Sequence, residues 1–319
     1  MGSVIEQVVT DKYAIYNGDC VEVVSGLPEA SVDFCIYSPP FASLYTYSNS
    51  DRDMGNVKDD DEFFEHFAFL VEQLYRVMAP GRIMAVHCMN LPASKTRDGF
   101  IGIKDFRGDL IKHFQSVGFI YHSEVCIWKD PVVAMQRTKA LGLLHKTIKK
   151  DSAMSRQGLP DYLIALRKPG VNEKPIAGEF KHYVGDNPPI GFKGFEYNDG
   201  RSYYVPGPQN TSIDVWQNYA SPVWDDIRQT NTLQFREARD SDDERHICPL
   251  QLDVIERAMQ LWSLPGDVVL SPFMGIGSET YMAVKMGRKA IGAELKPSYF
   301  RIAAQNMVRA DDTQYEMAL

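Results

Sequence analysis

The sequence predicts a mixed α/β fold, in which buried strands alternate with amphipathic helices. The first observation is the apolar run 32–37, which has the length and composition of a buried strand. The second is the segment 61–78, where apolar side chains recur at helical spacing until Pro80-Gly81 ends the helix. The third is the segment 265–300, which divides into turn, strand, glycine-bearing loop, helix, strand and helix. Such alternation is typical of a parallel sheet covered by helices.

The same patterns continue through most of the chain. Further strands are expected at 82–88, 120–128, 161–167, 268–271 and 289–293. Further helices are expected at 105–117, at about 279–286, and where Leu252, Ile255, Met259 and Trp262 restore helical spacing. Residues 170–245 show no sustained period, but their aromatic side chains favour a folded insert over a disordered one.

Composition limits the class of protein. The 319 residues are 44% hydrophobic and 24% charged, which is ordinary for a soluble chain with one large α/β domain. No apolar run approaches the roughly 18–20 residues that span a bilayer, and the amino terminus carries no signal-peptide pattern. The five cysteines are scattered without a C-x-x-C pair, so neither a zinc site nor a disulfide framework is predicted. We therefore expect a cytoplasmic protein with no metal ion and no membrane partner.

Charge is distributed unevenly. The formal net charge of −8 disfavours nucleic acid as a partner when taken alone, because affinity for nucleic acid comes largely from neutralised phosphates. Residues 137–168, however, contain eight basic and two acidic residues, a net charge of +6 that leaves −14 for the remainder. Such a stretch is either a solvated surface or a face that contacts nucleic acid.

The tetrapeptide Ser38-Pro39-Pro40-Phe41 ends the first apolar run with chemically useful groups. Two successive prolines stop a strand, and open α/β sheets bind ligands at the carboxyl ends of their strands. Phe41 could stack on a planar base, while the Ser38 oxygen and stiff backbone carbonyls could accept hydrogen bonds from an exocyclic amine. Taken alone, an ordinary proline-rich turn is the better explanation of these four residues.

The loop after strand 268–271 has the features of a nucleoside site. Gly275 and Gly277 allow the backbone to approach a ligand closely. Glu294 ends the next strand, 17 residues after Gly277, where a carboxylate can hold ribose hydroxyls. The Gly-x-Gly pattern alone is weak evidence, but its position between a strand and a helix strengthens it.

Together these motifs resemble the β group of DNA amino-methyltransferases, which use S-adenosylmethionine. The family's catalytic tetrapeptide, Asp/Asn/Ser-Pro-Pro-aromatic, is matched by residues 38–41, and its cofactor loop, Asp-Pro-Phe-x-Gly-x-Gly, by residues 271–277. Residues 246–251 are similar to the segment that flanks the cofactor. Residues 17–20 (Asn-Gly-Asp-Cys), ahead of the first expected strand, are similar to the element whose aspartate meets the adenine. The catalytic motif comes first and the cofactor motif last, which is the order of the β group.

The resemblance implies a fold and a division of the chain. The fold would be the Rossmann-like S-adenosylmethionine-dependent methyltransferase fold, with a seven-stranded, mainly parallel sheet and one antiparallel hairpin made of 120–128 and 161–167. Residues 12–136 would form the catalytic half and 246–310 the cofactor-binding half of one domain. Residues 137–245 would supply a basic loop, a returning strand and an irregular target-recognition insert.

The site residues that the resemblance implies fall into three groups. The catalytic group is Ser38, Pro39, Pro40 and Phe41. The group binding S-adenosylmethionine is Asp19 (adenine amine), Glu294 (ribose hydroxyls), His246, Pro249, Ser271, Pro272, Phe273, Gly275, Gly277 and Ser278. The expected contacts to double-stranded DNA come from Arg137, Lys139, Lys146, Lys149, Lys150 and Arg156. The oligomeric state is left open, with a homodimer as one option.

The implied reaction is transfer of a methyl group to an exocyclic amine of a flipped base. Within the family, serine at position 38 of this chain is associated more often with N4 of cytosine than with N6 of adenine. We therefore expect cytosine N4, with adenine N6 as the alternative. Ser271 stands where the family usually has aspartate. One expected polar contact to the methionine end of the cofactor therefore comes from a neutral side chain and not from a charged one.

Three other classes are alternatives. A cytosine C5 methyltransferase needs a cysteine nucleophile, usually in Pro-Cys, whereas this chain has only the reversed pair Cys248-Pro249. Protein or RNA amine methyltransferases share the Pro-Pro-aromatic turn, but they typically carry Asn before it and have the cofactor loop first. A non-catalytic DNA-binding regulator would bind DNA without binding or consuming S-adenosylmethionine.

Overall fold

The computed structural model describes residues 4–41, 54–57, 60–93, 95–138, 143–176, 195–196, 202–203, 216, 218–234 and 249–317. The strands are β1 (Glu6–Val9), β2 (Tyr13–Asn17), β3 (Phe34–Tyr37), β4 (Ile83–Cys88), β5 (Leu91–Ala93), β6 (Gly102–Lys104), β7 (Ile120–Ile127), β8 (Asp161–Arg167), β9 (Phe195–Glu196), β10 (Ser202–Tyr203), β11 (Val223–Trp224), β12 (Val268–Ser271) and β13 (Lys289–Glu294). The helices are α1 (Cys20–Ser25), α2 (Asp60–Val77), α3 (Lys95–Asp98), α4 (Phe106–Val117), α5 (Pro131–Thr138), α6 (His145–Lys150), η3 (Ser152–Met154), α8 (Leu252–Trp262), α9 (Ser278–Lys285) and α10 (Pro297–Met317).

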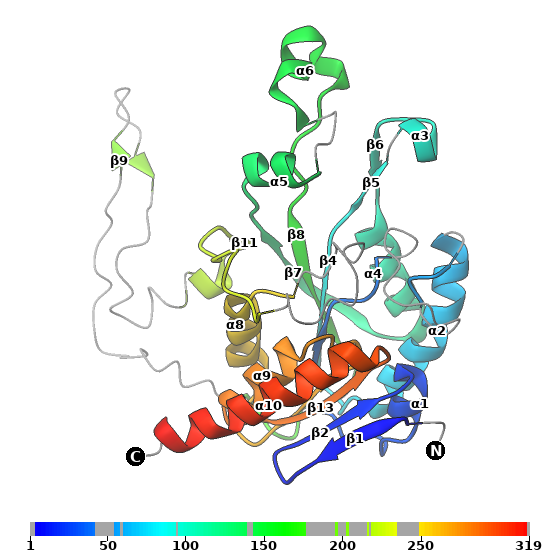
Figure 1. Ribbon diagram of the computed structural model, residues 1–319, viewed down its shortest axis with the longest axis vertical. Helices are drawn as coiled ribbons and strands as arrows, with labels where there is room; N and C mark the ends of the chain where they lie inside the picture. Colours follow the sequence, from blue (N-terminus) through cyan, green and yellow to red (C-terminus); the bar gives the residue numbers. More distant parts are fainter. Residues whose placement is uncertain are drawn as a thin grey trace.

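A mixed sheet forms the centre of the molecule (Figure 1). Its nine described strands follow the order β1-β2-β13-β12-β3-β4-β8-β7-β11. Neighbours from β2 to β4 are parallel, whereas β8 runs antiparallel to both β4 and β7. The expected hairpin of β7 and β8 is therefore confirmed, in register from Ile120 opposite Arg167 to Ile127 opposite Asp161.

The expected count of seven strands was wrong for the described sheet. The strands from β2 to β7 in this order account for seven, and the structure adds β1 at one edge and β11 at the other. Three of the four residues of β1 are exposed, and β11 has two residues, so neither has the apolar pattern that marks a buried strand. Because β1 and β2 were not expected, residues 17–20 were placed ahead of the first strand, whereas they run from the last residue of β2 to the first residue of α1.

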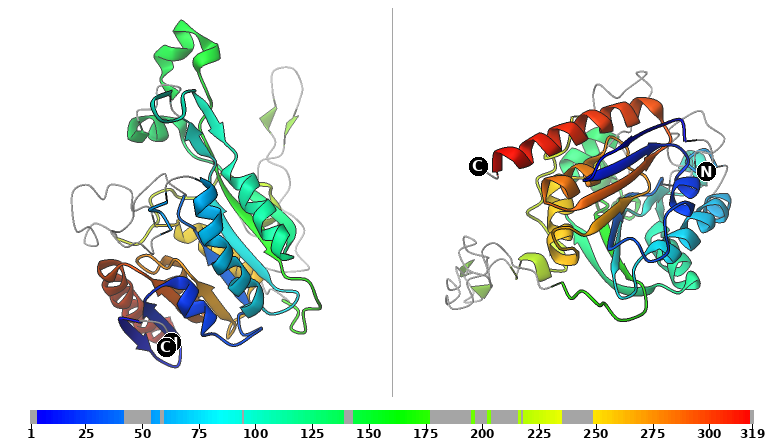
Figure 2. Two further views of the ribbon diagram at one scale, coloured as in Figure 1. Left: turned by 90° about the vertical axis from the view of Figure 1, so that its right-hand side faces the viewer. Right: turned by 90° about the horizontal axis from the view of Figure 1, so that it is seen from below.

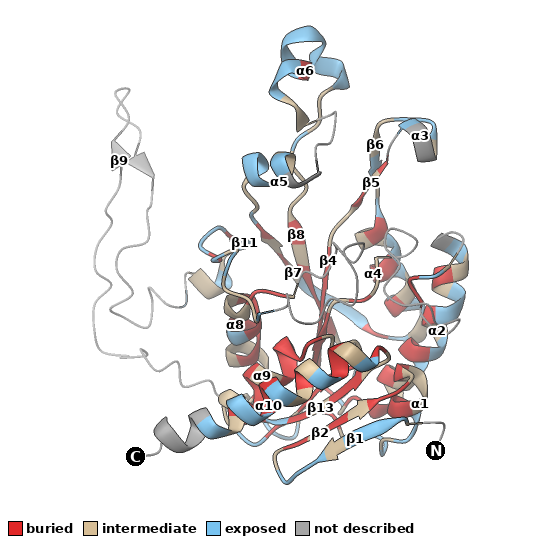
Figure 3. Ribbon diagram, in the orientation of Figure 1, coloured by how far each residue is buried: buried red, intermediate tan, exposed pale blue. Residues whose placement is uncertain are grey.

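Helices cover both faces of the sheet (Figure 2). The helices α1, α2 and α4 pack on one face, where Phe63 and Leu70 of α2 and Phe114 of α4 are fully buried. The helices α8, α9 and α10 pack on the other face, with Ile255 and Phe300 in their core. Every residue of β4 is buried, because both of its faces are covered (Figure 3).

Two segments project from the carboxyl edge of the sheet (Figures 1 and 2). Strand β4 leads into the hairpin β5–β6 and α3. Strand β7 leads into α5, α6 and η3, within the described residues 131–138 and 143–154, which we call the arm. Both β4 and β7 are antiparallel to β8, so both end at the same edge. Strand β3 is parallel to β4, so Ser38 lies at that edge as well.

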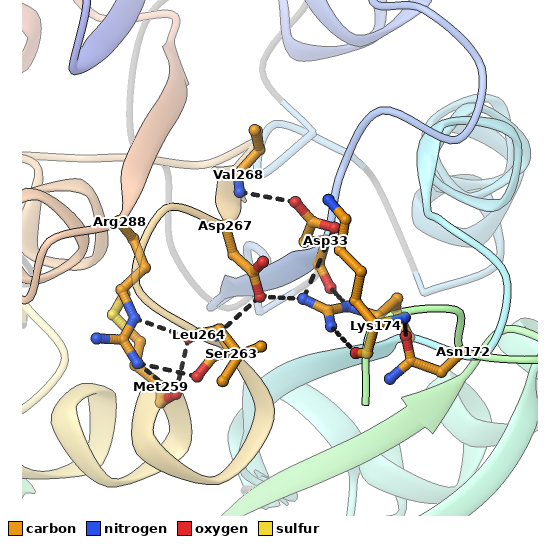
Figure 4. A network of polar contacts seen from close by, with 10 residues as sticks. Asp33, Asn172, Lys174, Met259, Ser263, Leu264, Asp267, Val268 and Arg288 are labelled. Carbon is orange, nitrogen blue, oxygen red and sulfur yellow. Dashed lines mark hydrogen bonds and ion pairs between the residues drawn. The ribbon is translucent and has the colours of Figure 1, made fainter. Parts of the chain in front are cut away.

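The opposite edge is held by a buried ion pair (Figure 4). Arg82, which directly precedes β4 and is 1% exposed, forms an ion pair with Asp267, which directly precedes β12. The Arg82 Nε also donates to the Asp33 carbonyl oxygen at 2.8 Å. The Asp33 carboxylate accepts from the Val268 N–H at 2.9 Å. These contacts align β3, β4 and β12 and join the early part of the chain to the late part.

Among the helices that the structure describes, none combines the length and the apolar character that a bilayer-crossing segment requires.

Candidate active site

Ser38 follows the last residue of β3, and its hydroxyl contacts a histidine from β4. The Ser38 Oγ lies 2.9 Å from Nδ1 of His87. The Nε2 of His87 in turn lies 3.1 Å from Oδ2 of Asp161, the first residue of β8. This second contact has the distance of an ion pair but not the alignment of a hydrogen bond. Three neighbouring strands thus bring serine, histidine and aspartate into one chain of contacts.

Asp161 is the buried anion of this group. Asp161 is 2% exposed, and its Oδ1 accepts a hydrogen bond from the Lys129 Nζ at 2.6 Å. Burial raises the pKa of Asp161, but the charges and contacts of His87 and Lys129 outweigh burial and hold that pKa below its usual value. The carboxylate beside His87 is therefore ionised at neutral pH.

His87, Lys129 and Asp161 were not predicted as site residues. The available signal was a polar residue near the carboxyl end of the expected strand 82–88 and an acid at the start of the expected strand 161–167. These positions meet only if the second strand runs antiparallel beside the first. The pairing of 161–167 with 120–128 was expected, whereas its pairing with β4 was not.

Phe41 lies at the same edge as Ser38 and is half-buried. Its ring meets the ring of Phe106, at the start of α4, with centroids 6.4 Å apart and planes at 82°. Pro39 is buried and Pro40 is partly exposed. This edge-to-face contact packs the last residue of the tetrapeptide against the start of α4.

The loop that follows β12 contains two glycines in different surroundings. Gly275 has φ +56° and Gly277 has φ +89°, both in the left-handed region that favours glycine. A Cβ added at Gly277 would lie 3.2 Å from the Ala303 Cβ, whereas one added at Gly275 would meet nothing within 4 Å. Gly277 therefore permits close packing against α10, and Gly275 borders open space.

Glu294, at the end of β13, is held against this loop. Its Oε2 accepts from the Gly275 N–H at 2.9 Å, and its Oε1 accepts from the Lys296 N–H at 2.8 Å. The Asn17 side chain donates to the Glu294 carbonyl oxygen at 2.8 Å, and the Gly18 N–H donates to the same oxygen at 3.0 Å. The segments 17–19, 271–277 and 294 thus lie together, as the nucleoside interpretation requires.

Asp19 also has a structural role. Its Oδ1 accepts from the N–H groups of Val21 and Glu22 at 2.9 and 3.1 Å, which caps α1. The expected contact with an adenine amine remains a prediction.

The catalytic turn and the cofactor loop meet through two rings. Tyr37, directly before Ser38, and Phe273 have ring centroids 5.7 Å apart. The Tyr37 hydroxyl and the Ser271 Oγ are buried and have no hydrogen-bond partner among the described residues. Unpartnered buried polar atoms are rare in folded proteins and call for an explanation, such as a ligand.

The remaining predicted residues are distributed as follows. Pro272, Gly277 and Ser278 are buried in the loop and at the start of α9, and Pro249 is partly exposed just before α8. Lys146, Lys149 and Lys150 are exposed on α6, whereas Arg156 is partly exposed and donates to the Gln157 carbonyl oxygen at 3.1 Å. Arg137 lies in α5, but its side chain is outside the description, and His246 and Lys139 lie outside the described residues.

A family model described as DNA methylase, of the N6/N4 methyltransferase type, matches residues 32–305. The chain belongs to this N6/N4 DNA methylase family. The enzyme class expected from the sequence, a DNA amino-methyltransferase, is thereby confirmed. The order of the two motifs assigns this methylase to the β group.

Curated relatives agree with the family. The type II methyltransferase M.BglII from Bacillus subtilis is 26% identical over 293 residues, which cover 91% of this chain and 68% of the relative. The DNA adenine methyltransferase YhdJ from Escherichia coli K12 is 24% identical over 214 residues, or 60% of this chain and 72% of the relative.

Solved structures show that the fold is shared. A protein from Thermus thermophilus, assigned as a DNA modification methylase and complexed with S-adenosyl-L-methionine, matches with TM-score 0.60 and 20% identity, covering 94% of this chain and 96% of that one. The cytosine-N4-specific PvuII DNA methyltransferase matches with TM-score 0.57 and 16% identity, covering 98% and 96% of the two chains. The expected methyltransferase fold is therefore confirmed.

Proposed function

We propose that this methylase transfers the methyl group of S-adenosylmethionine to N4 of cytosine in double-stranded DNA. The observation that carries the choice of cytosine is Ser38, a neutral acceptor, in the first position of the catalytic tetrapeptide. Relatives include both an adenine methyltransferase and a cytosine-N4-specific one, so N6 of adenine is the second candidate.

The residues of this chain fit S-adenosylmethionine, which supplies an electrophilic methyl group on a sulfonium. Glu294 carries a carboxylate for the ribose hydroxyls beside the open space at Gly275. The unpartnered Ser271 Oγ and Tyr37 hydroxyl are polar groups buried near this loop. The remaining contacts are assigned to Asp19 at the adenine and to Phe273, Gly277 and Ser278 along the loop, with Pro249, Pro272 and His246 beside them.

The chemistry of an exocyclic amine defines what the tetrapeptide must do. The amine lone pair is delocalised into the base, so the amine is a poor nucleophile. The base must also leave the duplex, which costs a few kcal/mol. Stacking on Phe41 offsets part of that cost, at ~1–3 kcal/mol per base. The Ser38 oxygen and the Pro39 carbonyl accept the two amine hydrogens, which aims the nitrogen lone pair at the methyl group.

The arm supplies a cationic surface for DNA. Lys146, Lys149 and Lys150 are exposed on α6, and the arm leaves the sheet at the edge where Ser38 lies. Lysines in this position can neutralise phosphates on one side of the flipped base. Arg137, Lys139 and Arg156 are assigned to the same surface from the sequence.

Product analysis tests this proposal. Unmodified double-stranded DNA is incubated with isotopically labelled S-adenosylmethionine and the protein, and the DNA is digested to nucleosides. We expect label in N4-methylcytosine, and much slower labelling by Ser38→Ala with cofactor affinity nearly unchanged. Label in N6-methyladenine would overturn the serine argument but keep the enzyme class. Label on a protein glutamine and none on DNA would overturn the proposal that DNA is the substrate of this chain.

A further inference from the structure

We propose that Ser38, His87 and Asp161 form a proton relay that removes a proton from the substrate amine as the methyl group is transferred. This inference rests on the proposed function and deepens it. His87 and Asp161 act through Ser38, so they are positioning residues, whereas Ser38 touches the amine.

The reaction leaves one proton to be removed. The amine lone pair forms the new N–C bond, the S–C bond breaks, and its electron pair stays on sulfur. The nitrogen then carries four bonds and the positive charge. A neutral methylamino product requires that one N–H proton leave, and an acceptor in contact with the amine is needed if this loss is to accompany bond formation.

Ser38 alone is a weak acceptor for that proton, because a protonated hydroxyl is strongly acidic. A second group must take the original hydroxyl proton while the oxygen receives the proton from nitrogen. His87 Nδ1, 2.9 Å from the Ser38 Oγ, is positioned to do so. The protons then balance: nitrogen loses one, Ser38 ends as a neutral hydroxyl, and His87 becomes an imidazolium.

Asp161 sets up His87 for this role. A neutral imidazole carries one N–H and one lone pair, and the carboxylate 3.1 Å from Nε2 favours the hydrogen on Nε2. That tautomer leaves the Nδ1 lone pair free for the Ser38 hydroxyl. After proton transfer the imidazolium lies between Ser38 and an ionised carboxylate, and Lys129 helps to keep Asp161 ionised before the reaction.

Burial of His87 and Asp161 indicates that they do more than make the protein surface polar to solvent. His87 is 8% exposed and Asp161 is 2% exposed. Burying an ionisable pair costs solvation energy, so its retention at the carboxyl edge calls for a compensating role. The order serine, histidine, aspartate also matches the nucleophile, base and orienting acid of serine hydrolases, where histidine takes the hydroxyl proton. Here the serine oxygen is an acceptor for an amine and forms no covalent bond with the substrate.

The relay also gives a physical account of a neutral serine in the tetrapeptide. A carboxylate in that position would attract the amine proton directly through its charge. Ser38 has no charge, but its contact with His87 connects the amine to the Asp161 carboxylate two strands away in the sheet. The carboxylate that other members of the family carry in the tetrapeptide is thus replaced in this chain by the Asp161 carboxylate at the start of β8.

Single-turnover methylation with excess protein tests the relay. We compare His87→Gln, which removes the acceptor at the Nδ1 position, with His87→Asn, which keeps an oxygen near that position but cannot take a proton. Both should slow methyl transfer on the order of 100-fold, within the range of general-base effects, with cofactor affinity unchanged. A normal rate in His87→Asn would overturn proton transfer, because orientation of Ser38 alone would then suffice.

A double-mutant cycle separates the relay from a structural effect. In a Ser38→Ala background, where the connection to the amine is already cut, His87→Gln should add less than about twofold, because residues of one network are not additive. Full additivity of the two effects would overturn the relay. His122→Gln, which alters an exposed histidine on β7, is the matched control and should methylate at the wild-type rate. Melting temperatures verify that each variant is folded.

A spectroscopic measurement gives a readout independent of activity. Nitrogen-15 NMR of the folded protein, with the His87 signal identified by its loss in His87→Gln, reports which ring nitrogen carries hydrogen when the ring is neutral. We expect hydrogen on Nε2, shifting in part to Nδ1 in Asp161→Asn; hydrogen on Nδ1 in the wild type would overturn the relay. If the wild-type protein methylates no DNA, the proposed function fails. If the wild type methylates DNA and the His87 variants match it, only the relay fails.

Discussion

Tyr37 and Phe273 lie with their ring centroids 5.7 Å apart, at 43° between planes, although they belong to opposite ends of the chain. Tyr37 is the last residue of β3, and Phe273 lies two residues after the end of β12. The two strands are parallel neighbours, with Cys35 opposite Leu270. Their carboxyl ends therefore lie side by side, and the tetrapeptide follows one strand while the glycine loop follows the other. This neighbour relationship allows the catalytic motif and the cofactor motif to be far apart in sequence and to form one site.

Gly275→Val should abolish cofactor binding without unfolding the protein. The added side chain enters open space beside the Glu294 carboxylate, which is where we assign the nucleoside. The left-handed φ of +56° should cost about 1–2 kcal/mol of stability, which a folded domain tolerates. Calorimetry with S-adenosylmethionine measures the affinity.

Gly266→Val is the matched control for that loss. Gly266 has φ +86° and likewise no atom within 4 Å of an added Cβ, but it lies before β12, away from the loop. It should show a similar loss of stability and an unchanged affinity. Equal cofactor affinity in both variants would remove the nucleoside assignment from this loop. Gly277→Val should also abolish binding, but the close Ala303 Cβ makes its effect on folding larger.

Asp267→Asn should destabilise the protein by about 1.5–3 kcal/mol, because it removes the nearer of the two carboxylates that pair with the buried Arg82 guanidinium and leaves only Asp33, at 3.7 Å. Urea unfolding at neutral pH measures the change. The control is Asp109→Asn, which breaks the exposed contact of Asp109 with Lys112 at 3.3 Å. An exposed pair of this kind contributes at most about 1 kcal/mol. Equal losses in the free energy of unfolding of the two variants would mean that the Arg82–Asp267 ion pair does not stabilise the edge of the sheet opposite the site.

Glu279→Gln should reduce the pH dependence of stability between pH 4.5 and 8. Burial raises the pKa of Glu279, on α9, from 4.5 to about 8. In this window the folded state holds a proton that the unfolded state has lost, so the free energy of unfolding falls as pH rises, by up to about 1.4 kcal/mol per pH unit. Glutamine carries no such proton.

Urea unfolding of wild type and Glu279→Gln from pH 5 to pH 8 measures this difference. The variant should gain stability relative to the wild type as pH rises. Glu256→Gln, which alters an exposed carboxyl on α8, controls for the loss of one acid and should follow the wild type. A constant difference between wild type and Glu279→Gln across this range would show that the carboxyl is not held protonated.

Local patterns predicted most of the fold, and tertiary pairing decided the rest. The helix expected at 61–78 is α2, which ends at Val77, ahead of Pro80 and Gly81. The strand expected at 268–271 is β12 with the same bounds. These elements have strong apolar periodicity, which is a local property of the sequence. Strand β1, by contrast, is mostly exposed and forms because β2 offers it an edge.

The same distinction applies to the site. The tetrapeptide and the glycine loop carry their chemistry in consecutive residues, so a motif could identify them. The contact of His87 with Asp161 depends on the antiparallel pairing of β4 and β8, which brings together residues 74 positions apart. A short motif contains no information about that pairing. The sequence therefore indicated the residues that we assign to ligand contacts, but it did not indicate His87 and Asp161, which contact Ser38 and one another.

Replacing Lys146, Lys149 and Lys150 with glutamine should weaken DNA binding and flatten its dependence on salt. Each lysine that neutralises a phosphate contributes about 0.9 to the slope of log affinity against log salt, so the slope should fall by up to about 3. These side chains are exposed on α6, so the change should leave the free energy of unfolding nearly constant. The control carries glutamine at Lys112, Lys174 and Lys289, which are exposed elsewhere and change net charge equally. Fluorescence anisotropy with a labelled duplex at several salt concentrations measures both slopes. If the two triple variants lose the same slope, general charge attracts the DNA, and the arm is not its binding surface.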